Sequence, residues 1–161
     1  MLAVEQLIAR VETRLDCLAE ASVECRLLHS IPGVGIRLAE IVVAVIGDLQ
    51  RFRRGKEVAS YAVLTPRQYQ SGDSDRQGKI SCQGNALLRS LLVEVSWVGL
   101  RYNPWLRAVY EQVRRESPAR KKIAIVAAAR RLLIRCWATL RDGVEWLFAP
   151  RPEVPIAVGA R

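Results

Sequence analysis

The chain has 161 residues, half of them hydrophobic, so it can bury a core and is too apolar for wholesale disorder. Its formal net charge of +9 favours an acidic partner. No apolar run approaches the roughly 18–20 residues that cross a bilayer, and the first ten residues read as a helix, not a signal peptide. We therefore expect a cytoplasmic location without membrane contact.

The four cysteines do not indicate a metal site. Cys17, Cys25, Cys82 and Cys136 show no Cys-x-x-Cys spacing, and His29 is the only histidine. A structural zinc site needs about four clustered Cys or His ligands. Reduced, buried thiols are therefore expected, and no metal ligand is assigned.

The positive charge is concentrated in the middle of the chain. Residues 65–135 hold 14 Lys/Arg against 5 Asp/Glu, whereas the flanking parts are balanced. Localised positive charge suits a polyanion, because each neutralised phosphate releases counterions. A solvated basic face on an ordinary protein remains an alternative. An anionic membrane is less favoured, since the basic residues do not lie on one isolated amphipathic helix.

The first thirty residues predict one helix with a heptad seam. Apolar or small residues recur at alternating intervals of four and three: Val4, Ile8, Val11, Leu15, Leu18, Ser22 and Cys25. This is the spacing of a coiled coil. Two outcomes stay open, namely a homo-oligomer formed through residues 4–25 and packing of this helix onto the chain's own core.

Residues 31–47 combine a glycine turn with an apolar helix. Gly33 and Gly35 allow a tight turn and close backbone approach. The free amides at the start of the following helix attract anions. This helix-hairpin-helix pattern predicts a phosphate contact at Gly33, Gly35 and Arg37, with a purely structural hairpin as the alternative. A basic connector follows, in which Phe52 is expected to anchor the arginines beside it.

Residues 65–85 are polar and show no apolar period. A polar loop of about twenty residues inside a compact domain is uncommon and is usually functional or disordered. A short β-hairpin, with strands around Gln68-Tyr69 and Lys79-Ile80, is the alternative for this segment.

Three helices are expected after the polar segment. Residues 86–100 are apolar on almost every side, which predicts the central buried helix. Asn103-Pro104 is a good N-cap and first-turn pair for the next helix. Ser117-Pro118 starts the last long helix, which closes at Gly143.

The expected fold is thus mainly α. We predict a helical bundle with an N-terminal coiled-coil-like helix (residues 1–30), a body with the helix-hairpin-helix and the polar loop (residues 31–148) and a loose tail (residues 149–161).

Several short motifs occur in the order of a known family. They are Leu28-His-Ser-Ile-Pro-Gly-Val-Gly35, Ile46-Gly-Asp-Leu-Gln-Arg-Phe52, Ala59-Ser-Tyr-Ala62, Leu64-Thr-Pro66, Ser71-Gly72, Gly78-Lys-Ile80 and Gly84-Asn85-Ala-Leu-Leu-Arg89. Together they resemble the C-terminal domain of the 110/116/902 group of insertion-sequence transposases over roughly residues 1–143.

The resemblance implies DNA transposition and recombination by a nucleoid-associated protein of bacterial type. Such transposases pair an RuvC-like domain, with an acidic metal-binding set, with a domain bearing a serine nucleophile, which matches Ser71. The partners implied are DNA and, for some members, a structured guide RNA, and Mg²⁺ is expected for the complete transposase. No RuvC-like half is recognised in this chain, so alone it is expected to bind nucleic acid without completing strand cleavage and rejoining.

The residues around Ser71 suit this chemistry. A serine hydroxyl needs assistance, and phosphoryl transfer depends on positioning and charge stabilisation. The predicted phosphate contacts are Arg67, Arg76, Lys79, Asn85, Arg89, Arg130 and Arg131. The alternatives are a non-catalytic helix-hairpin-helix module or truncated transposase remnant, in which Ser71 is a plain loop serine, and a helical oligomerisation protein with incidental charge.

Overall fold

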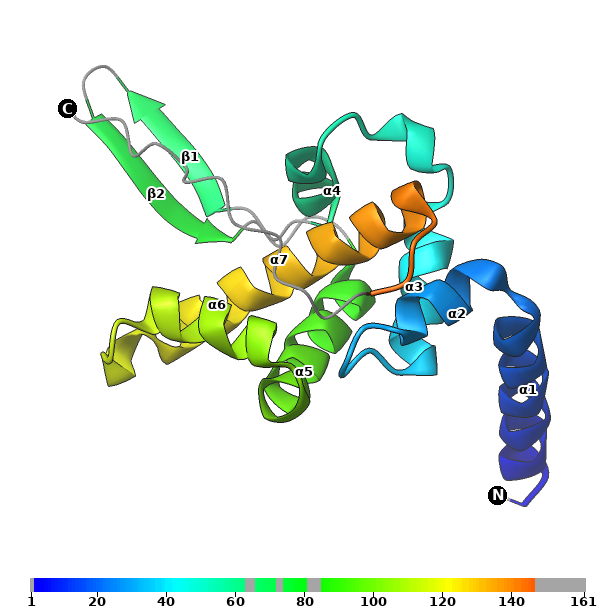
Figure 1. The fold of residues 1–161 in the computed structure, drawn as a ribbon. Helices are drawn as coiled ribbons and strands as arrows, with labels where there is room; N and C mark the ends of the chain where they lie inside the picture. The colour runs from blue at the N-terminus through cyan, green and yellow to red at the C-terminus, as the bar shows by residue number, and fades with distance from the viewer. Residues whose placement is uncertain (1, 63–65, 72–73, 81–84, 147–161) are drawn as a thin grey trace.

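The computed structural model describes residues 2–62, 66–71, 74–80 and 85–146, with the backbone alone between residues 66 and 80. The helices are α1 (Leu2–Ala21), α2 (Val23–His29), α3 (Ile36–Ile46), α4 (Gly55–Tyr61), α5 (Ala86–Tyr102), α6 (Pro104–Arg114) and α7 (Lys121–Asp142). Short 3-10 turns, η1 (Leu49–Arg51) and η2 (Pro118–Arg120), and two strands, β1 (Pro66–Ser71) and β2 (Ser74–Ile80), complete them. The predicted mainly α fold is confirmed (Figure 1).

The central helix is α7, and the prediction that residues 86–100 would be central was wrong. Helix α7 packs against α2, α3, α4, α5 and α6, and its fully buried Ala128 and Ala129 let those neighbours approach closely. Helix α5 buries Leu92 but leaves Trp97 and Val98 about half exposed. An apolar run indicates that a helix can be buried on at least one face. Small side chains on several faces indicate that other helices can pack closely around it on several sides.

The turn between α2 and α3 is locked against the junction of α5 and α6. Gly33 has φ +91°, and a Cβ built on it would lie 3.0 Å from the Cα of Gly99. The buried Asn103 donates from Nδ2 to the carbonyl oxygen of Pro32 at 3.0 Å, and its Oδ1 accepts from the N–H of Leu106 at 3.1 Å. The close approach predicted for Gly33 is therefore made to the chain's own backbone.

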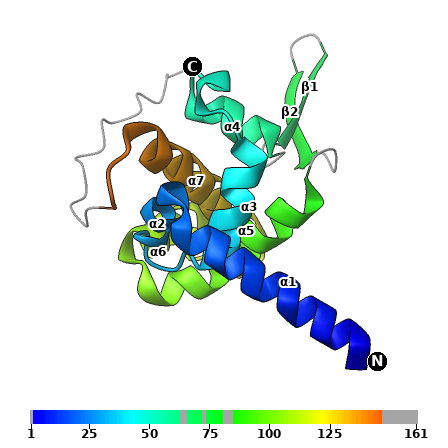
Figure 2. The same cartoon turned by 90° about the vertical axis from the view of Figure 1, so that its right-hand side faces the viewer.

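Helix α1 extends away from the helical body (Figures 1 and 2). The predicted single helix over residues 1–30 breaks at Ser22, because the Ser22 hydroxyl caps α2 by accepting from the N–H of Cys25. Each large apolar side chain of the α1 face is at least 41% exposed: Val4, Leu7, Ile8, Val11, Leu15 and Leu18. These side chains of the seam are therefore not packed onto the chain's own core, whereas Cys25, at the end of the seam on α2, is buried in that core.

The segment after α7 folds back onto the body. The N–H of Trp146 donates to the Ser30 hydroxyl at 2.8 Å, and its ring packs edge-on against Trp105 with centroids 5.5 Å apart. The Arg135 guanidinium lies 4.7 Å from the Trp146 ring centroid. This C-terminal clasp joins α2, α6 and α7. The tail predicted to be loose, residues 149–161, lies outside the described residues.

The polar segment contains an antiparallel hairpin, so the β-hairpin alternative is confirmed. Ser71, the last residue of β1, pairs with Ser74, and Tyr69 pairs with Arg76. The register is irregular between Pro66 and Gln68. Both views show the hairpin projecting from the helical body, with the end of β1 at its outer tip (Figures 1 and 2).

None of the helices in the described ranges has the length and apolar character needed to cross a bilayer.

Two asparagine N-caps allow a matched test of the locked turn. Asn103→Ala should lower the free energy of unfolding by roughly 2–4 kcal/mol, because it removes a cap and leaves the Pro32 carbonyl without its donor. Asn85→Ala should cost only about 1 kcal/mol, since exposed Asn85 caps α5 by accepting from the N–H of Leu88 and makes no comparable long-range bond to any other described residue. Urea unfolding of both variants measures the difference. Equal losses would show that the bond to Pro32 adds nothing.

Candidate nucleic-acid interface

The predicted site residues fall on three parts of the fold. The turn before α3 carries Gly33, Gly35 and Arg37; the hairpin carries Arg67, Ser71, Arg76 and Lys79; the helices carry Asn85, Arg89, Arg130 and Arg131. The hairpin and the start of α5 are adjacent in the chain, whereas the α3 turn packs at the other end of α5, beside Gly99.

The arginine at the α3 turn is already paired with carboxylates. Arg37 Nη2 lies 3.0 Å from Asp16 Oδ1 of α1, and Nη1 lies 3.2 Å from Glu40 Oε2. The hydrogen bond to Glu40, with smaller contributions from both carboxylates, raises the pKa of Arg37. Two carboxylates at this distance compensate much of the charge that was predicted to face a phosphate. The feature most open to an anion here is the N-terminus of α3. Its N-cap residue, Gly35, is exposed and has no side chain that could accept a hydrogen bond from the first amides of the helix.

The hairpin carries the predicted nucleophile at its outer end. Ser71 is the last residue of β1, Arg76 lies opposite Tyr69, and Arg67 falls where the register is irregular. The side chains of Ser71, Arg67, Arg76 and Lys79 lie outside the described residues. The end of β1, where Ser71 lies, is at the outer tip of the projecting hairpin (Figure 1).

Asn85 and Arg89 lie at the start of α5, shortly after β2 in the chain. The side-chain oxygen of Asn85 is used as the helix cap. Arg89 is half-buried, and its Nη1 is buried without a hydrogen-bond partner among the described residues. A buried guanidinium N–H without an acceptor is costly, so an anion that reached it would gain a charge-assisted bond.

Arg130 and Arg131 lie half-buried in the middle of α7. Among the residues that the structure describes, neither has a carboxylate within ion-pair distance. Helix α4 packs on the same helix nearby, since a Cβ on Gly55 would lie 2.6 Å from Ile134 Cγ2. Both arginines therefore lie, without a carboxylate partner among the described residues, on the helix against which α4 packs.

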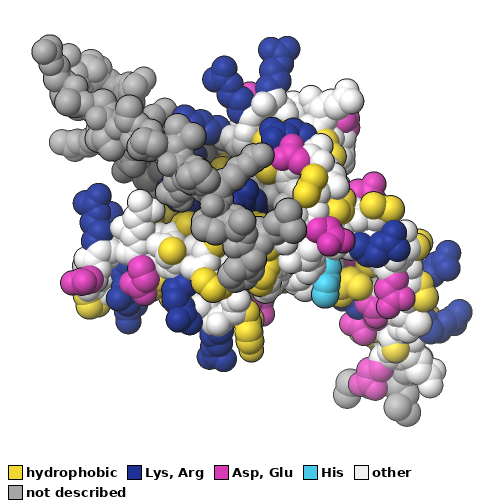
Figure 3. All heavy atoms as spheres, viewed as in Figure 1, with side chains coloured by type: hydrophobic (Ala, Val, Ile, Leu, Met, Phe, Trp, Pro, Cys, Tyr) yellow, Lys and Arg dark blue, Asp and Glu magenta, His cyan; other side chains and the backbone are white. Residues whose placement is uncertain are grey.

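A group of exposed cations around α4 was not among the residues predicted to bind nucleic acid. Arg51, Arg53, Arg54 and Lys56 are all exposed in η1, the following loop and α4. Figure 3 shows Lys and Arg side chains above this part of the molecule, while acidic side chains gather over α1. The signal was present in the run from Arg51 to Lys56, but we interpreted it only as a connector.

The thiols differ in exposure. Cys25 and Cys136 are buried as predicted, whereas Cys17 is exposed on α1, so that prediction was wrong for Cys17. Cys82 lies outside the described residues. Burial raises the pKa of Cys136 to about 12, which keeps this thiol protonated. Across the described ranges, no three His, Cys, Asp or Glu side chains are grouped to hold a metal ion.

Comparison with known proteins decides the family. Residues 25–111 match the transposase IS116/IS110/IS902 family. The chain belongs to this family. The matched region runs from α2 into α6 and includes the hairpin with Ser71, while Arg130 and Arg131 of α7 lie beyond it.

Individual relatives extend the match. The transposase for insertion sequence element IS1111A of Coxiella burnetii is 34% identical over 116 residues, which are 67% of this chain and 32% of the relative. The pilin gene-inverting protein of Moraxella lacunata is 32% identical over 142 residues, 87% of this chain and 44% of the relative. The insertion element IS110 protein of Streptomyces coelicolor is 29% identical over 141 residues, 88% and 35% respectively. Our chain, a member of the IS116/IS110/IS902 family, thus matches between about a third and somewhat less than half of the length of these relatives.

The burial of the thiols predicts their reactivity. In the folded protein at pH 8, Cys17 should react with a thiol reagent as fast as a free peptide thiol, and Cys136 should react only after unfolding. Mass spectrometry of tryptic peptides after timed labelling measures both. Cys17→Ser is the control and should leave Cys136 unlabelled in the folded state. Rapid native labelling of Cys136 would contradict the burial described for α7.

Proposed function

We propose that this chain is the DNA-handling domain of a transposase or recombinase that cleaves and rejoins strands through Ser71. The observation that carries the proposal is the projecting hairpin with Ser71 at its outer end, in a chain of this family whose excess positive charge starts at that segment. A nucleophile on a projecting element can reach a phosphate while the helical body holds the flanking strand.

In the proposed reaction, the Ser71 hydroxyl oxygen attacks a phosphorus of the DNA backbone. A serine–phosphate ester forms, the bond from phosphorus to one deoxyribose oxygen breaks, and the released hydroxyl takes up a proton. Attack by another strand's hydroxyl reverses the exchange, so the phosphodiester is conserved for rejoining. The serine proton must pass to a base, and the complete transposase would supply this base and Mg²⁺ through an acidic RuvC-like domain.

The cations around the hairpin would hold the phosphates. In an antiparallel ladder, directly paired residues and residues two apart occupy one face. The register gives Ser71, Tyr69 and Arg76 positions of the same face. Arg89 offers a buried N–H that has no acceptor among the described residues, and Arg67 and Lys79 lie in β1 and β2. We place Arg130 and Arg131 on the path of the flanking duplex.

Two further partners are proposed. The exposed α1 seam suits a homo-oligomer formed through residues 4–25, because a coiled-coil partner would cover its apolar side chains. A structured guide RNA carries the same phosphate backbone as DNA and would suit the same basic surface. A nucleoid-associated location in a bacterial cytoplasm follows from DNA as the partner.

The α2–turn–α3 geometry favours a second candidate, a non-catalytic helix-hairpin-helix module or transposase remnant. The exposed, uncapped Gly35 leaves the first amides of α3 open to a phosphate. In this candidate Ser71 has no chemical role, and binding depends on Gly33, Gly35 and the basic flank.

Covalent capture separates the two candidates. Purified chain is incubated with nicked element-end DNA, with and without a full-length family member, and denaturing gels reveal a protein–DNA adduct. We expect an adduct with the wild type that is lost in Ser71→Ala and retained in Ser74→Ala, since Ser74 pairs with Ser71 in the ladder. If wild type and Ser71→Ala behave identically in the presence of the full-length protein, the chain binds DNA without a catalytic role for Ser71.

The basic flank of α7 is tested by the salt dependence of binding. The double change Arg130→Gln/Arg131→Gln should weaken duplex DNA binding about tenfold at low salt and reduce the slope of log affinity against log salt by about 1.8. Arg10→Gln/Arg14→Gln removes the same charge from α1 and should leave the slope nearly unchanged. Arg37→Gln should have a smaller effect than either α7 change alone, because Arg37 is paired. A flat wild-type slope would exclude any phosphate-driven function.

A further inference from the structure

We infer that η1 and α4 form a binding site for an unpaired nucleotide of the nucleic acid, separate from the predicted contacts at the hairpin and α7. The α4 corner is defined by Arg51, Arg53, Arg54, Lys56 and Tyr61. The inference rests on the proposed function, because it names the form of nucleic acid that this part of the domain holds. It does not depend on Ser71.

The charges of the α4 corner lack carboxylate partners. All four cationic side chains are exposed, and among the described residues none lies in an ion pair. The two nearby carboxylates bind backbone instead: Asp48 accepts from the N–H of Gln50, and Glu57 accepts from the N–H of Arg53 at 2.8 Å. These acids shape the loop, and the four side chains remain available for phosphates.

An aromatic platform lies beside these charges. The Phe52 and Tyr61 ring centroids are 5.5 Å apart, and the Arg51 guanidinium carbon lies 5.6 Å and 5.4 Å from them. Phe52 is buried, whereas Tyr61 is 45% exposed. Stacking limits the motion of the Arg51 guanidinium, and the exposed part of the Tyr61 ring offers a surface on which a base can stack.

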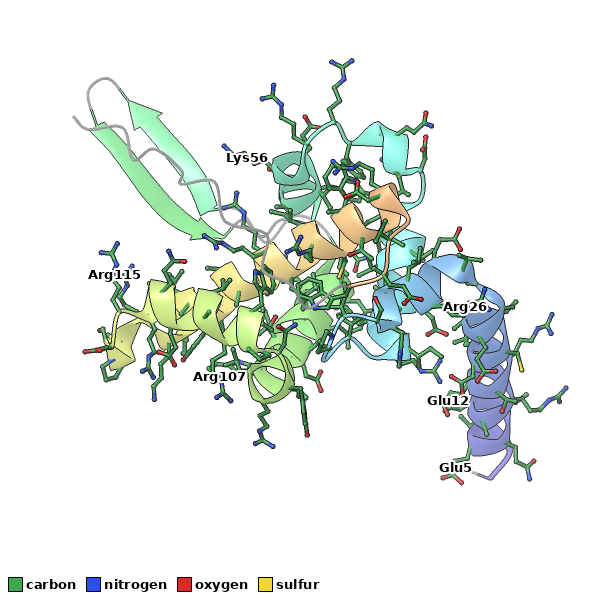
Figure 4. The ribbon with its side chains drawn as sticks, in the orientation of Figure 1. Glu5, Glu12, Arg26, Lys56, Arg107 and Arg115 are labelled. Atoms are coloured by element: carbon green, nitrogen blue, oxygen red, sulfur yellow. The ribbon has the colours of Figure 1, made fainter. Side chains whose placement is uncertain are left out.

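The α4 corner is held firmly against the body. Gly55 packs on Ile134 so closely that an added Cβ would lie 2.6 Å from that side chain. Val58 and Ala59 of α4 are fully buried. The stick view shows Lys56 on the side of α4 towards the hairpin (Figure 4). Lys56 therefore extends the cations of the α4 corner in the direction of the hairpin.

The combination favours a single strand over a duplex. Four cations within six residues can follow one backbone, and stacking on Tyr61 requires a base whose face is free. In a duplex the base faces are covered by neighbouring pairs, and only phosphates and groove edges remain accessible. Strand exchange produces unpaired nucleotides next to the reacting phosphate, and the α4 corner joins four exposed cations to an exposed ring.

The test measures binding of a fluorescein-labelled 20-nucleotide single strand and of the matching duplex to the full chain. Arg53→Gln/Arg54→Gln should weaken single-strand binding about tenfold and lower its salt slope by about 1.4, against little change for the charge-matched Arg10→Gln/Arg14→Gln. Tyr61→Ala should weaken single-strand binding about tenfold and duplex binding less than twofold, and Tyr61→Phe should restore it. Circular dichroism melting checks that each variant is folded; Arg53 and Arg54 are exposed, so their double change keeps the test informative should Tyr61→Ala unfold.

Two outcomes would overturn the inference. One is an Arg53/Arg54 variant that binds single strands like the α1 control. The other is a Tyr61→Ala loss that is equal for duplex and single strand. If Arg130→Gln/Arg131→Gln still weakens binding in that case, the proposed function stands and only the α4 corner is excluded. If wild-type binding is insensitive to salt, the proposed function itself fails.

Discussion

The structure depends on the burial of α7. Its small residues, among them Ala124, Ala128 and Ala129, are fully buried and allow five other helices to pack on one axis. Dense packing of this kind gains dispersion contacts that larger side chains at the same positions would disrupt. Because α7 is held on several sides, the backbone that carries its two central arginines has a defined position relative to α4, α5 and α6.

Charge compensation then divides the arginines into two classes. Arg37, Arg114 and Arg141 each lie within 3.2 Å of a carboxylate oxygen and serve the fold. Arg135 stacks on Trp105 and Trp146 and holds the C-terminal clasp. The remaining cations of η1, α4 and central α7 have no such partner among the described residues. The positive charge of a sequence segment is therefore only a coarse guide to where nucleic acid binds. Arginines that are paired or stacked within the fold alternate along it with arginines that are available to phosphates.

The helices and the caps could be predicted from local signals. Asn103 caps α6 as expected, Gly143 ends α7, and the hairpin lies where strands were the alternative. The errors concern tertiary choices. The sequence could not show that Ser22 interrupts the first helix, that α7 rather than α5 is surrounded, or that Asp16 of α1 reaches Arg37. Each of these features depends on which surfaces pack against each other. Apolar periodicity indicates only that a helix has a face to be buried, not which element covers it.

Ser71 is a further case in which the sequence and the structure supply different information. Its assignment came from resemblance of short motifs, and the backbone adds that it ends a projecting strand. The pairing of the arginine at the α3 turn, in contrast, could not be read from the glycine motif, because Asp16 lies on another helix. The role of Ser71 therefore stays a prediction from the family motif, whereas the pairing of Arg37 became visible only in the structure.

The contact between Gly33 and Gly99 has a consequence for how this domain can change over time. A side chain at Gly33 would meet backbone at 3.0 Å and a positive φ, while one at Gly99 would meet Leu106 Cδ2 at 2.9 Å. The space on either side is already filled, so a larger residue at Gly99 requires Leu106 to shift or shrink, and one at Gly33 requires the turn to be rebuilt. Mutational paths through these three positions should be strongly epistatic, with single steps selected against and compensated combinations accessible.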